Sequence, residues 1–118
     1  MNVLVIGASL KPIRYSNIAI KMLREYHHQV FAIGLREGTV NGVKIEKGMP
    51  EFKDIHTVTL YLNPQRQKEY YQYIINLKPK RVIFNPGTEN QEFYTLLKNN
   101  NINIEVACTL VLLRSDMF

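Results

Sequence analysis

Short apolar runs recur along the chain and are separated by longer segments of mixed polarity. The first two, Val3–Ile6 and Val30–Ile33, are unbroken, and each is followed by a glycine, Gly7 and Gly34. Runs of this kind are typical of strands that are covered on both faces in a parallel sheet. Three later segments predict further strands: Thr57–Leu62, Val82–Phe84 and Ile102–Val106.

The segments between these strands have the period of a helix. Ile18, Met22, Leu23 and Tyr26 predict a helix over 17–27, with Ser16 near its N-cap. Two further helices are expected from their start signals: one from the N-cap and N1 pair Asn63-Pro64 to about Leu77, and one from the capping box Thr88–Gln91 to Asn99–Asn101.

Three segments predict smaller elements. Asn41-Gly42 is a strong turn signal, so Val40–Ile45 is expected to form a small hairpin. Glu51–Asp54 is expected to form one helical turn. The apolar run Val106–Leu113 is interpreted as a buried strand that leads into a short segment.

The alternation of strands and helices predicts an α/β fold. We expect one domain over residues 1–118, with a Rossmann-like, doubly wound, mostly parallel sheet of five strands.

Composition narrows the classes of function. Hydrophobic residues make up 46% of the chain, so a buried core is expected and disorder is not. No apolar run has the roughly 18 residues of a membrane span, and no secretory signal is visible. The single cysteine fits a reducing compartment, so the cytoplasm is expected. The net charge is +5, but the basic residues are scattered, and neither a nucleic acid nor a membrane is expected as a partner.

The loop after the first strand holds the most informative chemistry. In doubly wound sheets, ligands bind at the carboxyl ends of the strands, where a helix N-terminus favours an anion. The segment from Gly7 and Ala8 to Asn17 lies there, but Ser9 stands where a dinucleotide fingerprint has its second glycine. Hydroxyls of Ser9 and Ser16 and the guanidinium of Arg14 are expected to supply donors in its place. Alternatively, Ser16 only caps the helix and Arg14 is a solvated surface residue.

The segment after the second strand bears on the ribose. An acidic residue there would accept from a 2′-hydroxyl, whereas a basic residue would favour a ribose that carries a phosphate. Gly34 is followed closely by both kinds, Arg36 and Glu37. The sequence leaves open which of the two side chains faces the ligand.

Together these segments resemble the small CoA-binding domain family, stand-alone relatives of the N-terminal domain of the succinyl-CoA synthetase α subunit. The resemblance covers nearly the whole chain and rests on five segments: Gly7-Ala8-Ser9 with Pro12 and Arg14–Asn17, Gly42, Leu62–Pro64, Asn85–Glu89 and Val106–Cys108. The family usually has Asn-Pro after the second strand, where this chain has Gly34-Leu35, and often has arginine where this chain has Ala107.

The resemblance implies binding of the nucleotide end of coenzyme A. Ser9 and the segment Arg14, Tyr15, Ser16 and Asn17 would contact phosphates, and Arg36 would lie near the ribose phosphate. The same edge would be lined by Gly34, Asn63, Pro64, Pro86 and Gly87.

No catalytic or metal site is predicted. The three histidines, His27, His28 and His56, precede strands and so belong to the opposite edge of the sheet, and Cys108 has no evident base beside it. We therefore expect a non-catalytic protein that binds CoA or an acyl-CoA, as a sensor or an accessory subunit, with a homodimer or a partner enzyme as possible assemblies. The alternative is an NAD(P)-binding enzyme or redox sensor.

Overall fold

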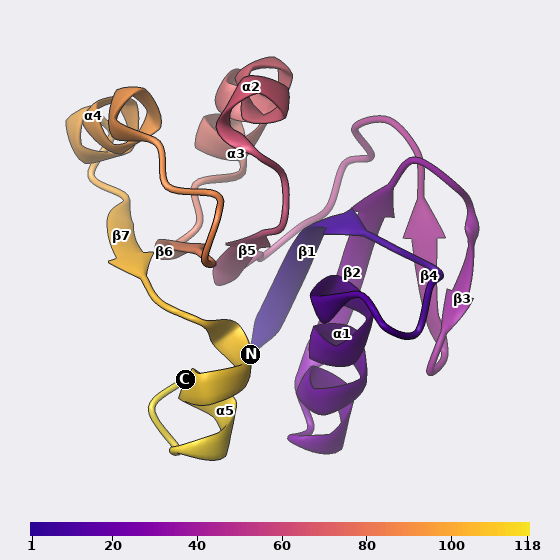
Figure 1. Ribbon diagram of the computed structural model, residues 1–118. Coiled ribbons are helices and arrows are strands. Elements are labelled where there is room, and N and C mark those ends of the chain that lie inside the picture. Colours follow the sequence, from indigo (N-terminus) through magenta and orange to yellow (C-terminus); the bar gives the residue numbers. More distant parts are fainter.

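The computed structural model covers residues 1–118, and one mixed sheet of seven strands runs through it (Figure 1). The strands are β1 (Asn2–Ala8), β2 (Gln29–Gly34), β3 (Gly38–Val40), β4 (Val43–Glu46), β5 (Thr57–Leu60), β6 (Arg81–Phe84) and β7 (Asn103–Val106). Their order in the sheet is β3-β4-β2-β1-β5-β6-β7. The five expected strands are all present, but the predicted number is wrong because the hairpin adds two.

The hairpin joins the sheet instead of standing outside it. β4 runs parallel to β2 and pairs Ile45 and Glu46 with Ala32 and Ile33, while β3 is antiparallel to β4. When β3 is set aside, the parallel strands numbered along the chain have the order 3-2-1-4-5-6. This is the doubly wound order of dinucleotide-binding folds, and it places the switch point between β1 and β5.

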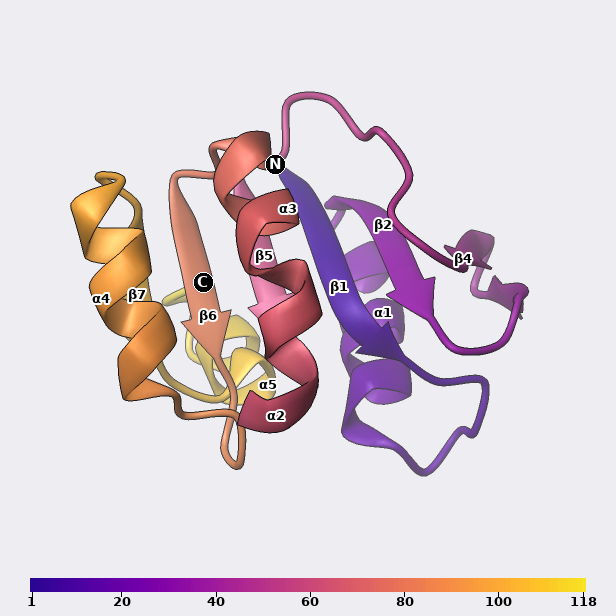
Figure 2. The same ribbon diagram turned by 90° about the horizontal axis from the view of Figure 1, so that it is seen from above.

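Helices cover both faces of the sheet. α1 (Tyr15–Glu25) and α5 (Thr109–Arg114) lie on one face, and α2 (Pro64–Gln67), the 3₁₀ turn η1 (Lys68–Tyr70), α3 (Tyr71–Leu77) and α4 (Gln91–Asn99) lie on the other (Figures 1 and 2). None of the helices is long and apolar enough to span a membrane.

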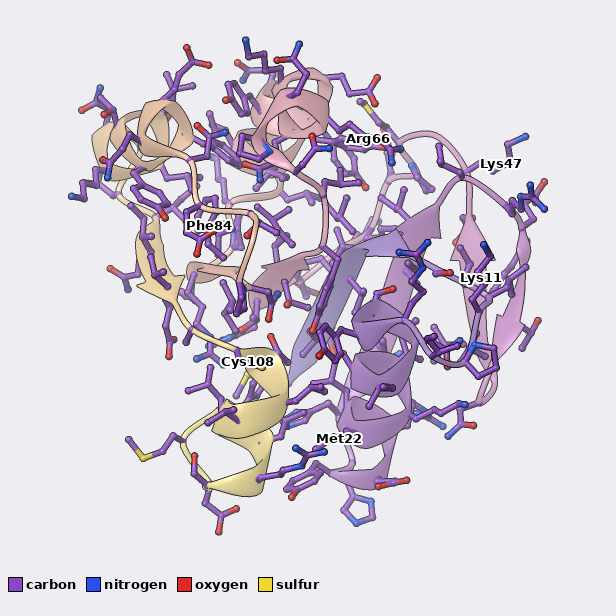
Figure 3. All side chains as sticks on the ribbon, in the orientation of Figure 1. Lys11, Met22, Lys47, Arg66, Phe84 and Cys108 are labelled. Carbon is purple, nitrogen blue, oxygen red and sulfur yellow. The ribbon has the colours of Figure 1, made fainter.

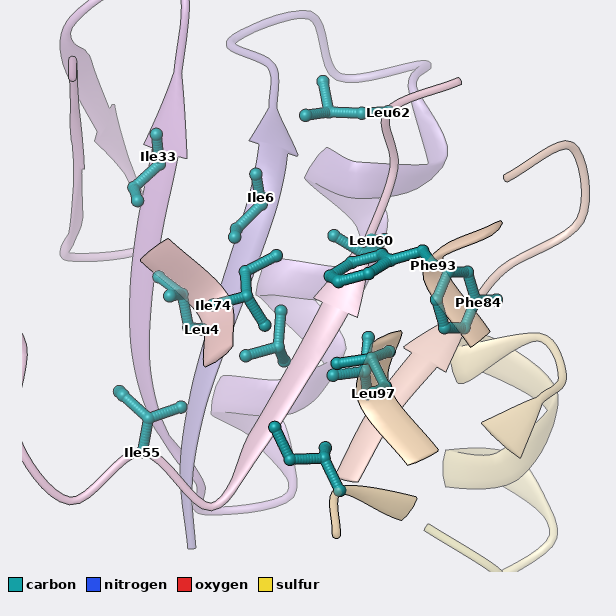
Figure 4. Close-up of a cluster of buried hydrophobic side chains, with 13 residues drawn as sticks. Leu4, Ile6, Ile33, Ile55, Leu60, Leu62, Ile74, Phe84, Phe93 and Leu97 are labelled. Atoms are coloured by element: carbon teal, nitrogen blue, oxygen red, sulfur yellow. The ribbon is translucent and has the colours of Figure 1, made fainter. Parts of the chain in front are cut away.

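Two apolar clusters fill the space between the sheet and its helices. On the α3 and α4 face, Ile74, Phe93 and Leu97 pack against side chains from the central strands (Figure 4). On the other face, Ile20 and Leu23 of α1 and Leu113 of α5 pack against β1, β2 and the hairpin. Since both faces are covered, β1 and β2 are unbroken apolar runs over Val3–Ile6 and Val30–Ile33, and this explains why the sequence identifies them.

Two helices, α1 and α4, begin at residues other than those predicted, because other residues occupy their N-caps. α1 begins two residues early because the Arg14 carbonyl already accepts from the amides of Asn17 and Ile18, so Ser16 lies inside the first turn. The capping box at Thr88–Gln91 is wrong: α4 begins at Gln91, and Asn90 Oδ1 accepts from the amide of Phe93. Asn90 also donates to Gln67 Oε1, a tertiary contact that the local pattern does not contain.

Three other expectations need correction or refinement. Asn63 and Pro64 start their helix as predicted, but it continues to Leu77 in three pieces, α2, η1 and α3. No helical turn forms at Glu51–Asp54. After β7 ends at Val106, the apolar run continues as helix α5 instead of a strand, because one of its faces packs on α1.

Asn85 connects three elements at the carboxyl ends of β5 and β6. Its Nδ2 donates to Thr59 Oγ1 at 2.7 Å and to the Leu60 carbonyl at 2.8 Å, and its Oδ1 accepts from the amide of Thr109 at 2.9 Å. All of these groups are buried. Asn85 thereby satisfies the first amide of α5 and fixes this helix to the sheet.

Replacing Asn85 tests this role. Asn85→Ala is expected to lower the free energy of unfolding by about 2–4 kcal/mol, because several buried polar groups lose their partner at once. Asn103→Ala, which removes an exposed asparagine of an edge strand, is the control and is expected to change it by less than about 0.5 kcal/mol. Urea unfolding would measure both variants, and equal midpoints would contradict the assigned role.

Candidate functional site

A cavity opens at the switch point of the sheet. Its volume is about 540 Å³, within the usual range for small-molecule sites. The lining comes from the loop after β1, the end of β2 and the segment after β5: Gly7, Ala8, Ser9, Leu10, Lys11, Arg14, Tyr15, Ser16, Ile33, Gly34, Leu35, Arg36, Tyr61, Leu62, Arg66 and Tyr70.

Two glycines permit the close approach of the strand ends around this cavity. Gly7 has φ +94°, and a Cβ there would lie 2.9 Å from the carbonyl carbon of Tyr61. A Cβ on Gly34 would overlap the carbonyl oxygen of Ala8. Gly7 also lies where the register of β1 on β2 shifts, just before the last pair, Ala8 with Gly34, after which the loop begins.

Short polar contacts shape the loop from Gly7 to α1. Ser9 Oγ accepts from the amide of Lys11 at 3.1 Å, and the Ser9 carbonyl accepts from Asn17 Nδ2 at 2.9 Å. The amides of Tyr15 and Ser16 have no acceptor in the protein, and neither does the hydroxyl of Ser16. The first turn of α1 therefore presents free donors at its N-terminus, where the helix dipole favours an anion.

Four basic residues line the cavity, and no acidic residue does. Lys11 and Arg14 come from the loop after β1, Arg36 follows β2, and Arg66 lies in α2. In Figure 3, Arg66 lies on the α2 side of the sheet and Lys11 on the α1 side. The salt bridge of the structure, Arg81 to Glu105, is made elsewhere, so none of the four is neutralised by a protein carboxylate within 4 Å. The cavity is consequently a region of positive potential that suits phosphate.

Eight of the thirteen predicted site residues line this cavity: Gly7, Ala8, Ser9, Arg14, Tyr15, Ser16, Gly34 and Arg36. Asn17 does not, because its side chain is buried behind the loop and holds Ser9. Arg36 lines the cavity whereas Glu37 does not. Their roles in ligand binding stay predictions.

The other four predicted residues, Asn63, Pro64, Pro86 and Gly87, lie in two loops beside the cavity and do not line it. Gln67 joins these loops, since its Nε2 donates to the carbonyls of Leu62 and Thr88, each at 2.8 Å. Asn63 caps α2, and the amide of Gly87 donates to Glu89.

Sequence reasoning missed the contribution of the helix after β5. Arg66 and Tyr70 both line the cavity, together with Leu62 at the start of that segment. Residues four apart share one face of a helix, so the i, i+4 spacing of Arg66 and Tyr70 could have identified them. That signal is meaningful only once β5 is known to lie next to β1.

Comparison with known proteins adds an independent observation. The family model described as "CoA binding domain" matches residues 1–114. The chain belongs to this CoA binding domain family. It matches no curated protein.

Solved structures agree with this fold. A crystal structure described only as an uncharacterized protein is 43% identical, with a TM-score of 0.96 over 99% of this chain and 97% of that one. A hypothetical protein from Pyrococcus horikoshii OT3 is 26% identical, with a TM-score of 0.86 over 98% and 82%. A Thermus thermophilus protein, 21% identical with a TM-score of 0.86 over 99% and 90%, shows the fold alone.

In this CoA binding domain, the histidines lie away from the cavity, whereas Lys11 and three tyrosines, Tyr15, Tyr61 and Tyr70, line it. His28 and His56 lie at the amino-terminal edge of the sheet, near Met1 and Arg81. Burial lowers the pKa of both histidines, and the positive charges of Arg81 and the amino terminus lower it further. Burial also raises the pKa of Tyr61, which lies near Thr109 and Cys108. No histidine or carboxylate lines the cavity.

The lowered pKa of the two histidines makes stability depend on pH. The unfolded chain protonates its histidines more readily than the folded protein does. The free energy of unfolding therefore has its full value above about pH 6.5, and it decreases as the pH falls from there through the lowered pKa values of the folded protein. Between pH 7.5 and 5.5, we expect the double variant His28→Gln/His56→Gln to lose less free energy of unfolding than the wild-type protein does. Chemical unfolding at both pH values measures it, and an equal loss in the two proteins would contradict the assignment.

Proposed function

We propose that this chain binds coenzyme A or an acyl-CoA through its phosphorylated nucleotide end, in the cavity at the switch point. The observation that carries the proposal is the cavity lining, with four unpaired cations, free helix-terminal amides and no carboxylate. Membership of the CoA binding domain family and the Rossmann-like strand order support it.

The two anionic parts of CoA suit two parts of the cavity. The diphosphate suits the loop after β1, where Lys11, Arg14 and the free amides of Tyr15 and Ser16 converge on the start of α1. The phosphate on the ribose suits Arg36, which follows β2, the strand that faces the ribose in dinucleotide-binding folds.

We propose a non-catalytic role, as a sensor or an accessory subunit. The histidines lie at the far edge of the sheet, and Cys108 is half-buried at the start of α5 with no histidine beside it. Binding of CoA would then act on a partner enzyme or on a second copy of the chain. An affinity pull-down with and without CoA tests the accessory role. If it recovers neither a partner enzyme nor a second copy of the chain, this role is contradicted.

An NAD(P)-binding role is the second candidate. It would use Glu37 on an unmodified ribose, or Arg36 on a phosphorylated one. Since Arg36 lines the cavity and Glu37 does not, a nucleotide with a phosphate on the ribose is favoured. Both CoA and NADP carry such a phosphate.

Isothermal titration with CoA, dephospho-CoA, NAD and NADP separates the candidates. We expect CoA to bind most tightly, and dephospho-CoA to bind less tightly because it lacks the ribose phosphate. Tighter binding of NAD or NADP than of CoA would overturn the proposal.

The variant Arg36→Ala tests the ribose phosphate contact. Loss of a charged hydrogen-bond donor is expected to weaken CoA binding on the order of 10- to 100-fold while leaving dephospho-CoA nearly unchanged. Arg24→Ala, an exposed arginine in the last turn of α1, is the matched control and is expected to change neither affinity. A CoA preference that survives Arg36→Ala would place the phosphate elsewhere.

A further inference from the structure

The cavity has a second wall that the phosphate contacts do not use. Arg66 and Tyr70 belong to the segment after β5, and the buried side chains of Ile33 and Leu62 also line the cavity. Lys11, Arg14 and Ser16 belong instead to the loop after β1 and the start of α1. The side formed by the loop after β1 and the start of α1 carries the basic residues together with Leu10 and Tyr15, and the opposite side carries Tyr70 and the guanidinium of Arg66.

Tyr70 is held in place before any ligand binds. Its ring meets the ring of Tyr73 edge-on, with centroids 6.2 Å apart, and the hydroxyl of Tyr73 donates to the Pro50 carbonyl at 2.6 Å. Tyr70 also packs against the large apolar cluster, and burial raises the pKa of its hydroxyl, so the ring is neutral at physiological pH. A flat, neutral ring with restricted motion is well suited to stacking.

Arg66 is available for contact beside this ring. Its amide donates to Asn63, which fixes the start of α2, but its guanidinium has no hydrogen-bond or ion-pair partner in the protein. Arg66 and Tyr70 are four residues apart and line the same cavity. A planar guanidinium next to an aromatic ring can stack on a base as readily as it can bind a phosphate.

We propose that Tyr70 and Arg66 bind the base of the nucleotide, so that the helix after β5 contributes the affinity for the base. This inference rests on the proposed function and names the residues that bind one part of the ligand. Ile33 and Leu62 are already buried, so phosphates alone would need only the basic loop and would leave the half-buried ring of Tyr70 against water. An aromatic base on this wall would cover the ring of Tyr70 and place the ribose near Arg36.

The first test uses the wild-type protein with and without the base on the ligand. Adenosine 3′,5′-bisphosphate and ribose 3,5-bisphosphate carry the same phosphates, and only the former has a base. Stacking on an aromatic ring is expected to make the adenosine compound bind about 5- to 150-fold more tightly. Equal affinities for the two compounds would overturn the inference.

The second test assigns the effect to Tyr70. Tyr70→Leu is expected to weaken binding of CoA and adenosine 3′,5′-bisphosphate about 5- to 150-fold but leave 4′-phosphopantetheine, which has no base, unchanged. Tyr70→Phe keeps the ring and is expected to stay within about threefold of wild type. Tyr26→Leu, a tyrosine at the far end of α1, is the matched control and is expected to bind all three ligands like wild type.

The outcomes separate this inference from the function on which it rests. If wild-type protein binds no CoA, the proposed function fails. If it binds CoA but Tyr70→Leu and Tyr70→Phe both match wild type, or if Tyr70→Leu weakens binding of 4′-phosphopantetheine equally, the base does not stack on Tyr70.

The variant Arg66→Ala tests the role of the guanidinium. It is expected to weaken binding of adenosine 3′,5′-bisphosphate more than that of ribose 3,5-bisphosphate. An equal loss would make Arg66 a phosphate ligand only.

Discussion

The close approach of three strand ends at the switch point is the constraint on which the rest of the site depends. The carboxyl ends of β1 and β2 are close enough that residue 34 has no room for a Cβ beside the Ala8 carbonyl, and residue 7 has almost none beside Tyr61. A side chain at either position would force the strands apart. Because Gly7 and Gly34 lack one, the chain turns out of β1 directly into the loop, and this loop meets the segment after β5 across a cavity.

The loop after β1 shows how phosphate binding is possible without a run of glycines. In the glycine fingerprint, the backbone itself approaches the diphosphate. Here Ser9 uses its hydroxyl to fold the loop on the amide of Lys11, and Asn17 holds the Ser9 carbonyl. The loop is consequently ordered by its own polar side chains, and the donors that face the cavity come from the basic residues and the helix terminus.

The parts of the structure that follow from local physics could be predicted from the sequence. The apolar strands, the N-cap pair Asn63-Pro64 and the ligand edge all have local signals. The position of the hairpin could not be predicted, because Asn41-Gly42 specifies a turn but not the strand beside which it lies. The cap of α4 was missed for a similar reason: Asn90 is held by Gln67 and Tyr71, which are distant in sequence. Arg66 and Tyr70 join the site only through the pairing of β5 with β1.

The central claim is that CoA binds where β1, β2 and β5 end, and amide chemical shifts during a CoA titration test it most directly. We expect the shifts to concentrate in residues 7–16, 34–36 and 62–70. A second, polar cavity at the opposite edge, which includes Lys78, Lys80 and Asn101, is the internal control and is expected to stay unchanged. Shifts that concentrate at that second cavity, or saturating CoA that shifts no resonance of the loop after β1, would contradict the account.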